Sequence, residues 1–146
     1  MILAIDPGTK ESACVGLRTD YSIITAEKIP NQKVLEMIEL GDHEVMVIEC
    51  MEPRTLNVSK SRVNAPYQRV GDETYETCIW IGRFMEAAYR RGMDVHRVMR
   101  SEERRMLIPS RKNKLPPLPE PVPKSVDAQI RAALVQRFAK HEQGPL

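Results

Sequence analysis

The chain opens with Ile2-Leu3-Ala4-Ile5-Asp6-Pro7-Gly8-Thr9-Lys10, an apolar run that ends in an acid and a turn. An apolar segment of this length, bounded by Pro-Gly, predicts a β-strand over Ile2–Asp6. Ser12–Arg18 and Ser22–Ile29 predict two further strands, and only the polar Thr19-Asp20 and Tyr21 separate them. Strands spaced so closely favour an antiparallel meander at the start of the chain.

A helix and a buried strand are predicted next. Gln32–Leu40 carries apolar residues at helical spacing, with Asn31 as the expected N-cap and Gly41 as the expected end. Val45–Cys50 is a compact, β-branched run of the kind found in buried central strands.

The clearest helical pattern runs from Asp72, the expected N-cap, to Arg91, with Gly92 as its stop. A spacing of three or four residues predicts that its apolar residues share one face. Those residues are Tyr75, Cys78, Ile81, Met85 and Ala88.

The rest of the chain predicts one more strand and one more helix. Met93–Met99 favours a strand, and Ser125 is expected to cap a helix that continues to about Lys140. Residues 109–123 hold six of the eleven prolines and predict an extended connector. The predicted fold class is therefore α/β, a mixed sheet flanked by helices.

Length and composition limit the organisation of the chain. It has 146 residues, of which 42% are hydrophobic and 29% charged, which is typical of one globular domain over 1–146 that includes the connector. The strongest apolar stretches, Met1–Ile5 and Val45–Ile48, are too short to cross a bilayer, and no secretory signal is visible. We expect a cytoplasmic protein that does not engage a membrane.

Charge is distributed unevenly along the chain. Residues 1–50 hold four basic and nine acidic side chains, whereas residues 51–146 hold eighteen basic and eleven acidic ones. Two basic stretches stand out, 54–70 and 97–114, and they suit a phosphate-backbone partner as well as an ordinary solvated surface. The residues we single out as nucleic-acid contacts are Arg54, Lys60, Arg62, Arg69, Arg104, Arg105, Arg111 and Lys112.

Two acids close predicted strands in positions where a core pattern would place apolar residues. Asp6 shares the face of Ile2 and Ala4 by the twofold period of a strand, and Glu49 shares the face of Val45 and Val47. A half-buried carboxylate is costly unless it is paired, hydrogen-bonded or bound to a cation. A single such acid could simply face water; two on successive strands favour a functional site.

A third acid, Asp127, falls inside the apolar stripe of the last predicted helix, beside Ile130 and Leu134. The simpler alternative is a first-turn acid that suits the helix dipole and pairs with Arg131. If all three acids face one cleft, their hard oxygen ligands select Mg²⁺ or Mn²⁺, and such sites hydrolyse phosphodiesters. Zinc is disfavoured because the cysteines and histidines are scattered.

Several of these segments resemble RuvC-type Holliday junction resolvases of the RNase H-like superfamily. Ile2–Lys10 resembles the family's first strand and turn, Val47-Ile48-Glu49 its fourth strand, and Ser125–Leu134 its final helix. The stretch Val70–Phe84 looks most like the small phage-encoded members. The resemblance spans nearly the whole chain and implies an RNase H-like sheet with three antiparallel strands followed by parallel ones.

The resemblance also implies roles for residues. Asp6, Glu49 and Asp127 would be the catalytic metal ligands for Mg²⁺, with Mn²⁺ as a substitute. The family's helix carries a further acid one turn before the closing aspartate, where this chain has Lys124, so the fourth ligand could be water or Glu52. Arg83 lies on the helix that such enzymes use for dimer packing or DNA contact.

The implied function is a homodimeric, structure-selective endonuclease that resolves four-way or branched DNA, phage-encoded or bacterial. One alternative is a YqgF-like ribonuclease, which is similar in size and in its Asp-x-Gly-Thr-Lys opening. Another is a junction-binding recombination protein without catalysis, which the departure at Lys124 leaves open.

Overall fold

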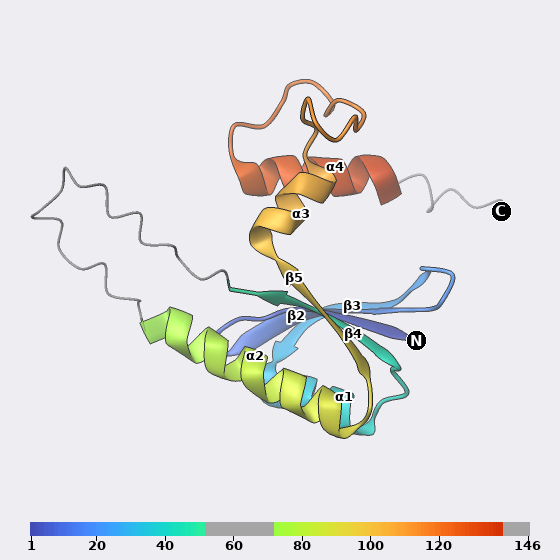
Figure 1. The fold of residues 1–146 in the computed structure, drawn as a ribbon, viewed down its shortest axis with the longest axis vertical. Helices are drawn as coiled ribbons and strands as arrows, with labels where there is room; N and C mark the ends of the chain where they lie inside the picture. Colours follow the sequence, from blue (N-terminus) through green and yellow to red (C-terminus); the bar gives the residue numbers. More distant parts are fainter. Residues whose placement is uncertain (52–71, 139–146) are drawn as a thin grey trace, which may run out of the picture. The chain divides into compact units, whose positions relative to one another are not determined.

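The computed structural model describes residues 1–51 and 72–138. Within them, strands form one sheet in the order β3-β2-β1-β4-β5 (Figure 1). β1 (Ile2–Asp6), β2 (Glu11–Leu17) and β3 (Ile23–Pro30) are antiparallel neighbours, and β4 (Val45–Cys50) runs parallel to β1. β5 (Asp94–Met99) lies at the edge beside β4. The predicted mixed sheet is confirmed.

Two helices cover one face of this sheet. α1 (Asn31–Leu40) and α2 (Asp72–Arg90) pack against each other, α1 also against β2 and β3, and α2 against β4. Burial in β1 and β4 alternates, so every second side chain faces the helices and the intervening ones lie on the opposite face. The buried core of this layer includes Leu3, Ile5, Val34, Ile38, Met46, Ile48, Ile81, Phe84 and Ala88.

The helix α2 turns a different side to the core than its sequence predicts. Its buried residues are Thr77, Ile81, Phe84, Ala87 and Ala88, whereas Tyr75 is 60% exposed and Cys78 is exposed. The predicted and observed stripes share Ile81 and Ala88, and burial of the large Phe84 ring rotates the stripe away from Tyr75. α2 ends at Arg90, one residue before its predicted end, and Gly92, the predicted stop, takes the positive φ of 71° that favours glycine.

Asn31 is the first residue of α1 and not its N-cap. Pro30 occupies the N-cap position, and no side-chain capping bond is formed there. The Asn31 side chain is instead buried and bonds to Ser12 and to the backbone of Gly8. The capping prediction is therefore wrong, since a partner distant in sequence competes successfully for this amide.

Residues from Met99 onward form a second compact unit. It contains α3 (Arg100–Leu107) and α4 (Val126–Phe138), joined by a segment without regular structure over the predicted proline-rich connector. Ser125 caps α4 as predicted, because its Oγ accepts a hydrogen bond from the Ala128 N–H at 3.2 Å. The single-domain organisation over 1–146 stays a prediction.

The helix α3, which lies within the basic stretch 97–114, was not predicted. Five of its eight residues are charged and only Met106 and Leu107 are apolar, so the sequence offers too few apolar residues to predict a helix from their spacing. The helix begins instead with a capping bond, in which the Glu102 carboxylate accepts from the Met99 N–H at 2.9 Å. Among the described residues, no helix is long and apolar enough to cross a membrane.

Candidate metal and nucleic-acid site

Asp6 and Glu49 end two adjacent parallel strands. The register pairs Ile2 with Val45 and continues in step to Ile5 and Ile48, so Asp6 and Glu49 occupy the next position on each strand. Residues in step on parallel neighbours share a face, and neighbouring strands lie about 4.8 Å apart. The two carboxylates therefore project from the same face, at the same end of the sheet.

The surroundings leave Asp6 accessible. Its partner on the other side is Ala13 of β2, which is small, and Asp6 itself is exposed. Glu49 is half-buried and lies between Ile48 and Cys50, whose side chains are buried on the helix-covered face. A pair of hard oxygen donors at one end of the sheet is a suitable start for a divalent-cation site.

The nearby thiol does not compete for this role. Burial raises the pKa of Cys50, with the negative charge of Glu49 acting in the same direction and the Arg97 guanidinium acting against it. Cys50 is also buried on the helix-covered face, whereas Glu49, the preceding residue of the strand, projects from the opposite face. The carboxylates are thus the donors this strand end offers.

Asp127 lies in the first turn of α4, in the second compact unit. The structure describes each unit by itself, and the Asp127 side chain lies outside the described ones. Among the side chains it does describe, no three acids, histidines or cysteines lie close enough to hold one metal ion. The three-carboxylate site consequently stays a prediction, with Asp6 and Glu49 as its positioned pair.

The predicted nucleic-acid contacts divide into two groups. Those in 54–70, together with Glu52, lie outside the described residues. Arg83 is exposed on α2, and its guanidinium stacks 4.2 Å from the centroid of the Trp80 ring. Arg104 and Arg105 are exposed on α3, and Arg111 and Lys112 are exposed in the turn that follows it.

The sequence did not predict the polar side chains that hold two turns in place, one after Asp6 and one around Arg111 and Lys112. Ser12 and Asn31 tie the turn after Asp6, and Asn113 ties the turn that carries Arg111 and Lys112. Ser12 does give a signal, since a polar residue occupies a position of β2 where strand alternation predicts burial. Asn113 gives none beyond being a common turn residue.

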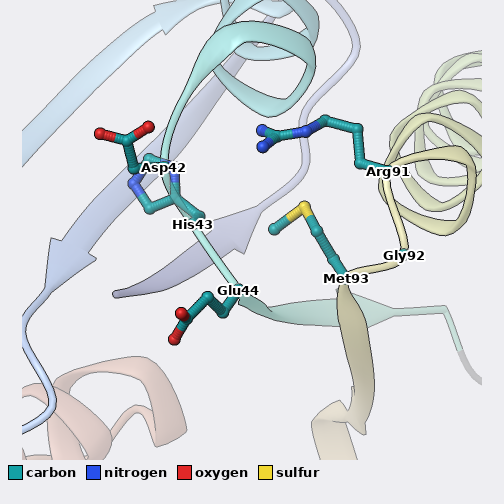
Figure 2. A pocket seen from close by; sticks show the side chains of 6 residues that line it. All are labelled: Asp42, His43, Glu44, Arg91, Gly92 and Met93. Carbon is teal, nitrogen blue, oxygen red and sulfur yellow. The ribbon is translucent and has the colours of Figure 1, made fainter.

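A cavity of about 360 Å³ opens at the other end of the sheet, where β4 begins (Figure 2). Its lining includes His43, Glu44, Arg91 and Met93. Arg91 is already engaged, because its guanidinium donates to the carbonyl oxygens of Ile38 and Gly41 at the end of α1. The cavity lies at the start of β4, whereas Glu49 lies near the end of that strand, so the cavity is separate from the carboxylate pair.

A mixed sheet with this strand order is typical of an RNase H-like fold. No family model and no curated protein sequence matches the chain. Solved structures do match. RuvC from Thermus thermophilus in complex with a Holliday junction substrate is 14% identical, with a TM-score of 0.51 over 96% of this chain and 94% of that chain.

A second match, described as the Thermus thermophilus RuvC structure, is also 14% identical and covers 97% of this chain and 96% of that chain, with a TM-score of 0.47. The junction-bound neighbour shows that the chain has a RuvC-like fold. The RNase H-like fold that the resemblance to RuvC-type resolvases implies is thus confirmed.

Proposed function

We propose that this chain is a metal-dependent, structure-selective DNA endonuclease that resolves Holliday junctions or other branched DNA by paired phosphodiester hydrolysis. The carboxylate pair of Asp6 and Glu49, in step at the ends of parallel strands, carries the proposal. The fold likeness to a RuvC that was solved with a Holliday junction supports it. Within that group, the sequence around α2 favours the small phage type, acting in the cytoplasm of a bacterium.

Asp6, Glu49 and Asp127 are the proposed ligands for Mg²⁺, with Mn²⁺ as a substitute. When bound, the ion would polarise the phosphate and lower the pKa of a water molecule. Asp6 and Glu49 would hold the ion through hard oxygens at the ends of neighbouring strands, and Asp127 would complete the set from α4. Because Lys124 replaces the family's further acid, water or Glu52 would supply a fourth ligand.

Affinity for DNA is proposed to come from the basic side chains. Each Lys or Arg that neutralises a phosphate releases condensed counterions, and this release provides sequence-independent binding. The proposed contacts are Arg54, Lys60, Arg62, Arg69, Arg83, Arg104, Arg105, Arg111 and Lys112.

The proposed assembly is a homodimer with α2 at its interface. A four-way junction has near-twofold symmetry, so two matched cuts require two sites related by a twofold axis. Tyr75 and Ile79 are 60% and 61% exposed and lie one helical turn apart on α2. Replacing both by Glu should give a monomer by light scattering at micromolar concentration, whereas Leu40→Glu, at another exposed apolar position, should not.

The decisive experiment incubates the purified chain and its Asp6→Asn variant with labelled four-way junction, linear duplex and structured RNA, in Mg²⁺ or EDTA. We expect symmetric nicks on the junction alone, only with Mg²⁺, and none from Asp6→Asn, which should still bind the junction. RNA cleavage would favour the YqgF-like ribonuclease. Junction binding without cuts under any condition would favour the non-catalytic alternative, and full turnover by Asp6→Asn would refute the assigned site.

A further inference from the structure

The turn after Asp6 is held by a closed ring of hydrogen bonds. The Gly8 N–H donates to the Ser12 hydroxyl oxygen at 3.2 Å, and that hydroxyl donates to Oδ1 of Asn31 at 2.6 Å. Nδ2 of Asn31 completes the ring by donating to the Gly8 carbonyl oxygen at 2.9 Å. Side chains therefore hold both the backbone N–H and the backbone C=O of Gly8, two positions beyond Asp6.

The ring is anchored in the core of its unit. Ser12 and Asn31 are each 1% exposed, and the Asn31 backbone N–H also donates to the Lys10 carbonyl oxygen at 2.9 Å. Asn31 begins α1, whose buried residues pack under the sheet, and Ser12 belongs to β2, which pairs with β1. The turn is therefore tied at once to a helix and to a neighbouring strand.

Gly8 is required by this close approach. A Cβ at this position would clash with the carbonyl oxygen of Glu11, which is backbone and cannot rotate away. Buried polar side chains stabilise a fold less than apolar ones of similar size unless every donor and acceptor is satisfied. In this ring every polar partner is satisfied and Gly8 permits the close backbone approach. We infer that the ring serves to fix the backbone path of the turn, since apolar side chains in its place would stabilise the fold at least as well.

We propose that Ser12 and Asn31 are positioning residues for the divalent-cation site at Asp6 and Glu49. This inference rests on the proposed function. Asp6 has a short side chain, so the direction of its carboxylate follows the backbone, and the ring fixes that backbone immediately downstream. Displacement of a reacting group by about 1 Å costs on the order of 100-fold in rate. Loosening the ring should thus weaken cation binding without removing any ligand.

The test measures Mn²⁺ binding without DNA, from the electron paramagnetic resonance signal of free Mn²⁺, at a temperature well below unfolding. Ser12→Ala should raise the Mn²⁺ dissociation constant at least tenfold, and the Mg²⁺ concentration for half-maximal junction cutting by a similar factor. Ser12→Thr keeps the hydroxyl and should restore both within twofold. Gly8→Ala keeps Ser12 and Asn31 but displaces the turn, and should resemble Ser12→Ala.

Thr77→Val is the matched control, because it also removes a buried hydroxyl, one that donates to the Glu73 carbonyl oxygen of its own helix. It should lower the thermal midpoint without changing Mn²⁺ affinity. If Ser12→Ala behaves like Thr77→Val in both respects, the ring only stabilises the fold and the inference is wrong. Suppose that Asp6→Asn abolishes Mn²⁺ binding whereas Ser12→Ala and Gly8→Ala leave it unchanged. That result would overturn the positioning role alone. If the native chain does not bind Mn²⁺, the proposed function is overturned as well.

Discussion

Two turns in this chain are each organised by an asparagine side chain, but by different means. In the first unit, Asn31 reaches back 23 residues to hold the Gly8 carbonyl, and its side chain is almost fully buried. In the second unit, Asn113 is half-buried, and its side chain bonds to backbone groups at most eight residues away. Its Nδ2 donates to the carbonyl oxygens of Arg105 and Ile108 at 2.9 and 2.7 Å.

The side chains that the turns carry differ as well. The first turn follows a short carboxylate, whose position is set by the backbone. The second carries Arg111 and Lys112, long flexible cations that can reach a phosphate from many backbone positions. A metal ligand needs sub-ångström placement, whereas a backbone phosphate contact does not. Under the proposed function, we therefore expect cutting to depend on the turn after Asp6 and DNA affinity to depend on the turn that carries Arg111 and Lys112, so that each can be impaired alone.

The largest effect is expected when Arg104, Arg105, Arg111 and Lys112 are all replaced by Gln. If all four meet phosphates, the slope of log affinity against log salt should flatten by about 3 to 4 units, at roughly 0.9 per contact. Junction binding at moderate salt should weaken at least about tenfold. Fluorescence anisotropy across a salt series measures both, while Mn²⁺ binding and cutting at saturating protein stay near the native values.

The matched control removes the same charge from the first unit, at Arg18, Lys28, Lys33 and Arg90, all exposed. Surface ion pairs such as Lys33–Glu36 and Arg90–Glu86 contribute little stability, so this variant should fold and keep the native salt slope. Equal flattening in both variants would mean that net charge and not position governs binding. An unchanged slope in the first variant would place the DNA path elsewhere.

A smaller effect is expected from Asn113→Ala. The change removes bonds that also include acceptance from the Ser110 N–H at 2.8 Å, but it leaves every cation in place. Ordering the loosened turn on DNA should then cost about 1 kcal/mol, or threefold to tenfold in affinity, with less than one unit of change in salt slope. Ser110→Ala, which removes only the acceptor for the Lys112 N–H, should cost less. A loss as large as that of the fourfold variant would show that Asn113 holds the whole second unit together.

The strands and the acids at their ends were predictable because they depend on local patterns. Continuous apolar runs locate β1 and β4, and the parallel pairing of these strands then brings Asp6 beside Glu49. The helix α3 has no apolar stripe, and its start depends on one Glu102 capping bond, so periodicity could not reveal it. The buried side of α2 depends on where Phe84 finds space under the sheet.

The ring of hydrogen bonds between Gly8, Ser12 and Asn31 was not predictable for a related reason. Asn31 before an apolar run is an ordinary N-cap signal, and the partner that outcompetes this role, Ser12, lies 19 residues earlier. Only the antiparallel pairing of β2 and the start of α1 bring the two side chains together. Contacts between residues distant in sequence are thus what the sequence alone leaves open, including the relation of Asp127 to the strand-end pair.

The smallest expected effect is a pH dependence confined to the first unit. Nδ1 of His43 is buried and has no hydrogen-bond partner among the described residues. Burial lowers the pKa of His43; the Met1 amine and Arg91 add to this, and Asp42 opposes it. The folded state therefore favours neutral His43, and near pH 6.5 and below the unfolded chain binds the proton more readily.

Stability from this group is accordingly complete above about pH 7 and declines as pH falls from there toward the lowered pKa of His43 in the folded state. The thermal midpoint should drop modestly between pH 7.5 and 5.5, and less in His43→Gln, which cannot take up a proton. His96→Gln is the control, because His96 is exposed beside Asp94. Since His43 lies at the opposite end of the sheet from Asp6, the salt slope of junction binding should not differ between native and His43→Gln chains at either pH. If His43→Gln altered the salt slope of junction binding, the proposed division of roles between the two units would be wrong, because a change in the first unit would then affect DNA binding by the cations of the second.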